Sequence, residues 1–296
     1  MTFVSKFTKT LLSAAAAALV ATSAWGATIT IGSKNFTEQL IIAEMTKQLL
    51  QSKGYTVNKK EGMGTSIVRA ALENGEVSLY WEYTGTSLIT FNKVTERLSP
   101  EETYERVRAL DAEKGLVWLA PSRANNTYAY VIKPDNPKTQ GFETISDLAK
   151  AYTDGVAVLM GTTAEFPRRA DGLIGLQKAY DFEAGRANLR PMDIGLAYNA
   201  LANGDIDTLT AQATDGQIAA MGLKVLKDDK EFFPSYVLTP VVRKDVLDAN
   251  PELKDILEAV SIKLDDATMA RMNGQVEVDK KTIEAVAADY LKSLGM

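Results

Sequence analysis

The chain has 296 residues, of which 46% are hydrophobic and 24% charged, and its formal net charge is −5. This composition is typical of a soluble globular protein with one large or two ordinary domains, and the acidic balance offers no basic surface for nucleic acid. The sequence has no cysteine and no histidine, which excludes disulfides, thiolate and histidine metal sites, and histidine-based triads. We therefore expect no metal and no cofactor, and a binding protein is favoured over an enzyme.

The first 26 residues have the pattern of a secretory signal peptide. Lys6 and Lys9 precede an apolar, alanine-rich run over residues 11–21, and the tripeptide Ala-Trp-Gly at 24–26 places small residues at the −3 and −1 positions of a cleavage site. The run is shorter than the roughly 20 apolar residues that span a bilayer, and no cysteine follows it to carry a lipid. The pattern predicts a periplasmic protein without a lipid anchor, cleaved near Gly26.

Periodic apolar residues predict alternating strands and helices in the first half of the remaining chain. Ser99, followed by Pro100 and Glu102, is typical of a helix start with an N-cap, a first-turn proline and a capping glutamate. The order strand, helix, strand, helix, strand favours a parallel sheet flanked by helices. We expect strands at 28–31, 77–82 and 117–120, and helices that begin near 40, 65 and 100 and end before Gly54, Gly75 and Gly115.

A second series of strands and helices follows a break at Pro134 and Pro137. The expected strands cover 128–133, 156–160, a segment near 189, 206–210, 224–226 and 236–242, and the expected helices cover 145–152, 176–180, 194–202, 253–264 and 281–294. The repetition indicates two α/β units rather than one.

The turn after the first strand is the first candidate site. Asn35 and Glu38 have the spacing of a helix capping box, and Thr37 is a competing cap. Lys34 lies in this strand-to-helix turn, where free backbone N–H groups also receive anions. The residue is therefore either an anion ligand or a solvated surface lysine.

The stretch from Tyr80 to Thr86 is the second candidate site. It places three aromatic rings, a carboxylate and two hydroxyl groups in seven residues that turn at Gly85. Aromatic faces attract cations, but the same rings are ordinary core material. The stretch alone leaves both interpretations open.

A short internal echo relates this stretch to the second half of the chain. Residues 71–77 (Ala-Leu-Glu-Asn-Gly-Glu-Val) match residues 200–206 (Ala-Leu-Ala-Asn-Gly-Asp-Ile). The echo is either a common helix-to-strand turn or the mark of two similar lobes. In the second case Tyr83 corresponds to Gln212 and Thr86 to Asp215. Because open α/β sheets bind ligands beyond the carboxyl ends of their strands, both pairs would then face a shared cleft.

Several ordered motifs resemble one known family. They are Gly-Ser-Lys-Asn-Phe-Thr-Glu-Gln at 32–39, Glu-Tyr-Thr-Gly-Thr at 82–86, Asn-Asn-Thr-Tyr at 125–128, Ala-Glu-Phe at 164–166 with Arg169 and Asp-Gly at 171–172, Thr-Asp-Gly at 214–216, and Asp-Asp-Lys at 228–230 with Phe-Phe-Pro at 232–234 and Tyr236. These residues, over nearly all of the chain after the signal peptide, resemble the substrate-binding proteins of osmoprotectant ABC importers, which take up glycine betaine, choline, carnitine and related quaternary amines.

The resemblance implies a fold, an organisation and a set of ligand-binding residues. The fold is α/β and two-lobed, of the periplasmic-binding-protein type (type II-like), with a ligand cleft between the lobes and two chain crossovers. Lobe I would comprise residues 27–126 and 235–296, and lobe II residues 127–234. The tyrosine cage for the cationic head falls on Tyr83, Tyr128 and Tyr236, the carboxylate clamp on Lys34 and Arg169, and further polar contacts on Thr86 and Asn126.

This division of the site suits the chemistry of a betaine. A quaternary ammonium group has no N–H to donate, so tyrosine faces hold it through their quadrupoles, at about 2 kcal/mol per ring when water is excluded. A carboxylate tail is held by a bidentate arginine and a lysine charge.

The sequence departs from the family where a tyrosine is usual and Gln212 stands. Losing one ring of the cage weakens quaternary-amine binding by roughly 30-fold if each ring contributes about 2 kcal/mol. Gln212 could instead bind a ligand that carries N–H or hydroxyl groups. Trp81 is a candidate replacement ring, and burial in the core is the competing interpretation. Gln212 is included in the predicted ligand-binding set.

The sequence thus predicts a monomeric periplasmic binding protein that delivers a small zwitterion or cation to an ABC permease in the inner membrane. A different zwitterion or amino-acid derivative, selected by Gln212, is the alternative within the same class. From another class, a two-lobed exported enzyme would use Glu82, Glu165 or Asp215 as acid or base. The sequence has no nucleophile motif to support the enzyme.

Overall fold

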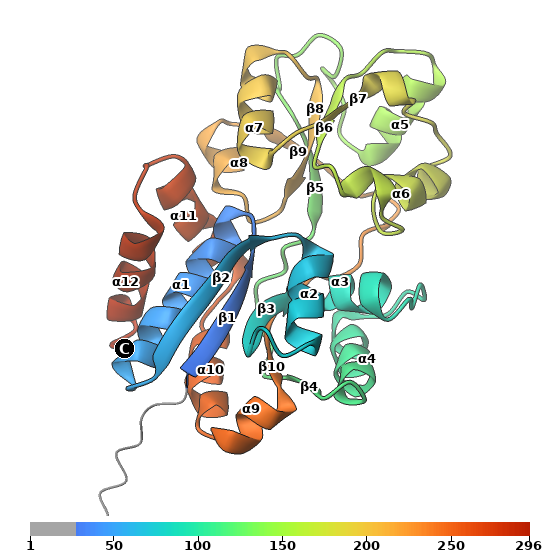
Figure 1. Cartoon of the computed structure of the whole chain (residues 1–296). Helices are drawn as coiled ribbons and strands as arrows, with labels where there is room; N and C mark the ends of the chain where they lie inside the picture. The colour runs from blue at the N-terminus through green and yellow to red at the C-terminus, as the bar shows by residue number, and fades with distance from the viewer. Residues whose placement is uncertain (1–27) are drawn as a thin grey trace, which may run out of the picture.

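Residues 28–296 are described by the computed structural model, in which two α/β lobes lie one above the other (Figure 1). The expected signal peptide, residues 1–26, lies outside the described residues. Each lobe is built on a five-stranded sheet with helices packed against it. We call the lobe that contains both ends of the described chain lobe I and the other one lobe II. In this part of the chain, no helix is both long enough and apolar enough to cross a membrane.

Lobe I contains the first and last thirds of the described chain. Its sheet has the order β2-β1-β3-β10-β4. The elements before the crossover are β1 (Thr28–Lys34), α1 (Thr37–Ser52), β2 (Thr56–Met63), α2 (Thr65–Glu73), β3 (Leu79–Tyr83), α3 (Thr84–Thr86), a π-helical turn η1 (Ser87–Phe91), α4 (Pro100–Ala112) and β4 (Leu116–Trp118). Those after the return are β10 (Leu238–Arg243), α9 (Lys244–Ala249), α10 (Leu253–Ser261), α11 (Asp266–Glu277) and α12 (Ile283–Ser293).

Lobe II contains the middle of the chain, and its sheet has the order β7-β6-β8-β5-β9. Its elements are β5 (Tyr128–Ile132), α5 (Ile145–Thr153), β6 (Met160–Thr162), the 3-10 turn η2 (Phe166–Arg168), α6 (Leu173–Tyr180), the 3-10 turn η3 (Arg186–Asn188), β7 (Leu189–Pro191), α7 (Ile194–Asn203), β8 (Thr208–Gln212), α8 (Gly216–Ala220) and β9 (Lys224–Leu226). The chain enters this lobe between β4 and β5 and leaves it between β9 and β10, which gives the two expected crossovers.

The sheets are mixed, so the expectation of a parallel sheet was wrong for one strand of each lobe. In lobe I, β10 runs antiparallel to β3 and β4, and in lobe II, β5 runs antiparallel to β8 and β9. The reason is the crossover. Most strands run toward the junction between the lobes, whereas β5 and β10 start there after the chain has crossed and run away from it.

The internal echo reflects two similar lobes. The helix–strand pair α2–β3 corresponds to α7–β8, because Thr65, Leu79 and Tyr83 hold the same register in the echo as Ile194, Thr208 and Gln212. The glycines that end the two helices both adopt φ +81°, a left-handed conformation that favours glycine. The two sheet orders also match strand for strand, with β10 of lobe I in the place of β5 of lobe II.

Strand β2 and helices α8 (Gly216–Ala220), α9 (Lys244–Ala249) and α11 were not predicted from the sequence. Strand β2 forms the edge of its sheet, and its segment Thr56–Met63 carries lysines and a glutamate that remain half-exposed or exposed. Helix α11 begins at an N-cap, where Asp265 accepts a hydrogen bond from the backbone N–H of Thr268 at 2.9 Å. The predicted capping box of Ser99 and Glu102 is confirmed, with both of its hydrogen bonds present.

The lobes also touch away from the crossovers, where helix α8 of lobe II rests on helix α11 of lobe I. A Cβ atom added to Gly216 would lie 2.3 Å from the backbone nitrogen of Gly274. The two backbones can approach this closely only because Gly216 has no side chain.

Candidate functional site

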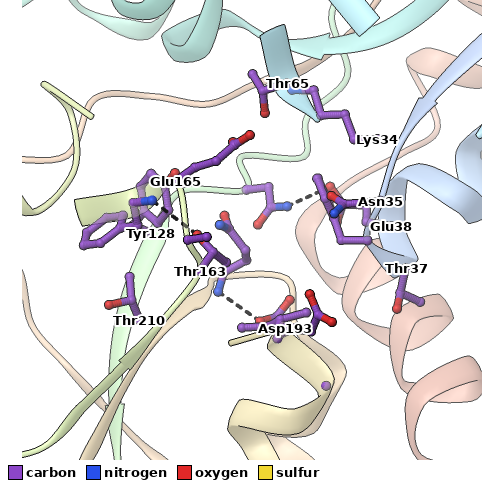
Figure 2. Close-up of a pocket in the computed structure, with 18 of the residues that line it drawn as sticks. Lys34, Asn35, Thr37, Glu38, Thr65, Tyr128, Thr163, Glu165, Asp193 and Thr210 are labelled. Atoms are coloured by element: carbon purple, nitrogen blue, oxygen red, sulfur yellow. Dashed lines mark hydrogen bonds between the residues drawn. The ribbon is translucent and has the colours of Figure 1, made fainter. Parts of the chain in front are cut away.

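A cavity of about 840 Å³ lies between the two lobes. Figure 2 shows side chains from both sides around it, with Lys34 and Glu38 from lobe I and Tyr128 and Glu165 from lobe II. All eight residues that the sequence analysis selected line this one cavity: Lys34, Tyr83, Thr86, Asn126, Tyr128, Arg169, Gln212 and Tyr236. The structure therefore brings the complete predicted set together, although the role of each residue in binding stays a prediction.

The ends of strands position these side chains. Lys34, Tyr83 and Gln212 are the last residues of β1, β3 and β8, and Tyr128 is the first residue of β5. Tyr128 and Gln212 are also direct partners across the β5–β8 ladder. The cavity thus lies at the carboxyl ends of the inner strands, as expected for α/β sheets.

Lys34 is buried and paired with a carboxylate, so its interpretation as a solvated surface lysine is wrong. Its side chain is 3% exposed, and its Nζ lies 2.5 Å from Oε1 of Glu82, which is fully buried. The same Nζ lies 4.8 Å from the centre of the Tyr83 ring. Burial lowers the pKa of Lys34, and the negative charge of Glu82 opposes that shift. The positive charge of Lys34 thus lies at the cavity wall, where the Glu82 carboxylate pairs with it.

Glu38 does not cap helix α1, so the predicted capping box was wrong, and Thr37 does not cap it either. The helix begins at Thr37 with Phe36 as N-cap and without a side-chain cap. The Glu38 carboxylate, 2% exposed, instead accepts hydrogen bonds from four side chains, which are Tyr83 Oη at 2.7 Å, Asn126 Nδ2 at 2.9 Å, Thr214 Oγ1 at 2.5 Å and Asn273 Nδ2 at 3.3 Å. Burial raises the pKa of Glu38, and these hydrogen bonds oppose the shift.

The aromatic side of the cavity is centred on Tyr128. Its ring lies 5.5 Å from that of Tyr236 in an edge-on arrangement, 4.8 Å from Phe166 and 5.3 Å from Phe233. Tyr83 lies in a separate group, stacked on Phe36 with 6.2 Å between ring centres. Two of the predicted cage tyrosines are therefore in ring contact, while Tyr83 contacts Lys34 and Phe36 instead. The sequence analysis did not predict a role for Phe36, Phe166 or Phe233, although all three lie inside the motifs that resemble the family.

Trp81 belongs to the core and does not line the cavity. Its ring is 1% exposed, packs in the hydrophobic cluster that includes Tyr83, and donates its indole N–H to Oγ1 of Thr46 at 2.9 Å. Tyr80 is also buried, and its hydroxyl donates to Glu82 at 2.9 Å. Of the stretch from Tyr80 to Thr86, only Tyr83 and Thr86 line the cavity.

Arg169 is held by a buried carboxylate behind the aromatic wall. Its Nε donates to Oδ1 of Asp171 at 2.8 Å and its guanidinium makes a second bond to Oδ2. The hydroxyl of Tyr236 donates to the same Oδ2 at 2.7 Å. The Arg169 guanidinium carbon lies 6.0 Å from the centre of the Tyr128 ring. Asp171 thereby fixes both a cation and a tyrosine at the cavity wall.

Four further carboxylates line the cavity, and the sequence analysis did not assign them to ligand binding. They are Glu165, Asp193, Asp215 and Glu277. Asp215 accepts hydrogen bonds from Tyr198 Oη at 2.8 Å and from the backbone N–H of Gln212 at 3.0 Å. Burial, together with the negative charges of Glu277 and Glu38, raises the pKa of Asp215 to about 7. The echo, which aligns Asp215 with Thr86, predicted that Asp215 faces the shared cleft, and its position in the cavity lining confirms this.

Comparison with known proteins gives the family. Residues 27–293 match the family model described as the substrate binding domain of ABC-type glycine betaine transport system. The chain belongs to this family. The predicted two-lobed α/β binding-protein fold is confirmed.

Members of the family resemble the chain over most of its length. It is 39% identical over 294 residues to the glycine-betaine-binding protein of Pseudomonas aeruginosa, covering 97% of this chain and 94% of the relative. It is 35% identical to the ergothioneine transport permease/ergothioneine binding protein of Helicobacter pylori, covering 90% of this chain and 48% of the relative. A solved structure described as a glycine betaine/carnitine/choline ABC transporter is 31% identical, with a TM-score of 0.71 over 90% of this chain and 98% of that one.

Proposed function

We propose that the chain is the periplasmic solute-binding component of an ABC importer and that it captures a quaternary ammonium compound such as glycine betaine, choline or carnitine. One observation carries the proposal. The aromatic rings of Tyr128 and Tyr236 and the positively charged side chains of Lys34 and Arg169 line the same cavity between the lobes. Family membership supports the transport role.

In this proposal the site has an aromatic end for the cationic head of the ligand and a positively charged end for its carboxylate. The faces of Tyr83, Tyr128 and Tyr236 hold the ammonium head, and Lys34 and Arg169 bind a carboxylate tail. Thr86 and Asn126 add polar contacts. The chain would act as a monomer that releases its ligand unchanged to a permease in the inner membrane, with no cofactor and no catalytic step. Cleavage of residues 1–26 would deliver it to the periplasm.

The proposed lobe division is 27–126 with 235–296 for lobe I and 127–234 for lobe II. Closure of these lobes on the ligand would exclude water, which strengthens both the cation–aromatic and the ion-pair contacts.

A second ligand class is favoured by the wall around Gln212. The Gln212 amide stands opposite Tyr128, where a further aromatic ring would hold a methylated ammonium group, and the Asp215 carboxylate accepts a hydrogen bond from the Gln212 backbone. These groups are suited to a zwitterion that carries N–H or hydroxyl donors. One relative is named for ergothioneine, a betaine with such donors, and this compound therefore belongs in the ligand panel.

Isothermal titration calorimetry with glycine betaine, choline, carnitine, proline betaine and ergothioneine tests the proposal. We expect saturable binding of at least one of the first four. If none of them gives heat or a thermal shift at millimolar concentration, the osmoprotectant assignment is wrong. A response to ergothioneine alone would favour the second class.

A further inference from the structure

The two most exposed large hydrophobic side chains of the described residues are Ile67, at 63%, and Leu196, at 61%. Single exposed apolar side chains are normal on protein surfaces and need no explanation. These two residues differ from isolated cases because they belong to corresponding helices of the two lobes, α2 and α7. The sequence of exposed and buried residues around them is also the same.

Ile67 and Leu196 occupy equivalent positions. Each is the third residue of its helix, and the register that aligns Tyr83 with Gln212 also aligns these two. The burial pattern agrees, since each is followed by two buried residues on the core side of its helix, Val68 and its neighbour in α2 and Ala197 and its neighbour in α7. Both lobes therefore carry an exposed apolar residue at the same helix position, although the core residues beneath it differ.

Both positions lie beside the mouth of the cavity. Thr65 and Ile194, the first residues of the two helices, line the cavity, and so does Leu196. The helices start from the ends of the lobes that face each other and lead away from the cleft (Figure 1). An apolar side chain thus stands on each side of the cleft, one on lobe I and one on lobe II.

We propose that Ile67 and Leu196 form a two-lobe docking surface for the membrane-embedded permease of the importer. A small ligand inside the cavity cannot cover both side chains, whereas a large partner that bridges the mouth covers them together. The inference rests on the proposed transport role, for which a permease is the required partner. In the Helicobacter pylori relative, the binding protein is named together with a transport permease, and this chain covers only 48% of it.

Placing one anchor on each lobe makes docking depend on closure. The distance between Ile67 and Leu196 changes when the lobes move relative to each other. A permease with two apolar pockets at a fixed spacing therefore binds one arrangement of the lobes best. Each pocket would bury one aliphatic side chain and stabilise the complex by removing its apolar surface from water.

Site-specific photocrosslinking in the native host tests the contact without knowledge of the ligand. A photoreactive benzoylphenylalanine replaces residue 67 or 196, and matched controls carry it at Ile262, 52% exposed on lobe I, or Val225, 48% exposed on lobe II. We expect positions 67 and 196 to crosslink to the same integral subunit of an ABC importer, identified by mass spectrometry, and the controls not to. Crosslinks only to a second copy of this chain, equal crosslinks at all four positions, or none at 67 and 196 would overturn the proposal.

A transport measurement separates docking from ligand binding. Ile67→Asp should lower glycine betaine uptake at saturating ligand about tenfold, with its calorimetric Kd within about twofold of the parent, because a charge cannot enter an apolar pocket without cost. Ile262→Asp is the control and should transport normally. Unchanged uptake by Ile67→Asp, or an equal loss in the control, would refute the docking role. If another osmoprotectant binds in place of glycine betaine, uptake of that compound is measured instead. If none of them binds, the proposed function fails, and the crosslinks alone decide the docking surface.

Discussion

The hydroxyl of Thr214 in lobe II donates a hydrogen bond of 2.5 Å to the Glu38 carboxylate of lobe I. The same carboxylate holds the hydroxyl of Tyr83 and the amide of Asn126, which precedes the first crossover. Glu38 therefore links a residue of the proposed cage, the crossover segment and the opposite lobe. It is also too deeply buried to contact solvent.

Replacing Glu38 by glutamine should weaken both folding and ligand binding. A glutamine keeps one acceptor oxygen and replaces the other by an NH₂ group that would face two donors, so up to two of the four hydrogen bonds are lost. We expect the free energy of unfolding to fall by about 2–4 kcal/mol and ligand affinity to fall about tenfold or more. Urea unfolding and calorimetry measure the two effects.

Thr214→Val provides the matched comparison, because it removes only the donor from lobe II. It should reduce ligand affinity while lowering the unfolding free energy by about 1–3 kcal/mol, less than Glu38→Gln does, because the other three donors stay in place. If Thr214→Val binds as the parent does, the hydrogen bond between the lobes has no part in binding.

Arg169→Ala should separate ligands by charge. A guanidinium–carboxylate contact contributes about 1.5–3 kcal/mol, so affinity for glycine betaine or carnitine should fall roughly 10- to 100-fold, and affinity for choline, which has no carboxylate, by less than about threefold. Calorimetry with the three ligands gives the comparison. Arg168→Ala, at the exposed neighbouring position, is the control. Equal losses for choline and glycine betaine would contradict the clamp.

Gln212→Tyr should improve the binding of quaternary amines. Position 212 pairs directly with Tyr128 across the β5–β8 ladder, so a new ring would stand beside an existing one. A gain of roughly 30-fold is expected if the ring contributes about 2 kcal/mol. Gln212→Leu removes the amide without adding a ring, and it should give no such gain. A fall in glycine betaine affinity on Gln212→Tyr would show that the amide itself contacts the ligand.

The affinity for choline should rise with pH because of Asp215. Its pKa, raised to about 7 chiefly by burial, means that this carboxyl changes from neutral to negative between pH 5.5 and 8.5, while the charge of choline stays constant. A negative charge in the cavity attracts the cation, so affinity should increase about three- to tenfold over this range. Asp215→Asn should abolish the slope, and Asp193→Asn, an exposed carboxylate of the same cavity, should keep it.

The same carboxyl affects stability in the opposite direction. Because the folded-state pKa lies above the ordinary value of 3.8, the folded protein binds more protons than the unfolded chain between about pH 4 and 7. The contribution of Asp215 to stability is thus greatest below pH 4 and is lost as the pH rises through 7. Asp215→Asn should remove this part of the pH dependence in urea titrations.

Local patterns in the sequence predicted which side chains gather, because strand ends and helix starts carry recognisable residues. The strand ends at Lys34 and Tyr83 were predicted to within three residues, and the echo aligned Tyr83 with Gln212 correctly. Direction was harder to predict, since nothing local in 128–133 or 236–242 reveals that the chain has just crossed between lobes and that its strand runs against its neighbours.

Hydrogen bonds between residues far apart in the chain could not be predicted from the sequence either. The spacing of Asn35 and Glu38 fits a cap, and only the fold shows that donors from residues as distant as Asn273 converge on this carboxylate. In the same way, the separation of Tyr83 from Tyr128 and Tyr236 depends on packing against Phe36, which no spacing rule encodes.

The matching sheets of the two lobes have a consequence for the ligand. They form a nearly symmetric frame, yet its equivalent positions carry different chemistry, with an aromatic ring at Tyr83 and an amide at Gln212, a hydroxyl at Thr86 and a carboxylate at Asp215. A molecule with two unlike ends therefore meets a different surface in each half and has one preferred orientation. Substitutions in one lobe can change which chemical group binds there while the contacts made by the other lobe stay the same. The ligand specificity of such a protein can therefore change one lobe at a time.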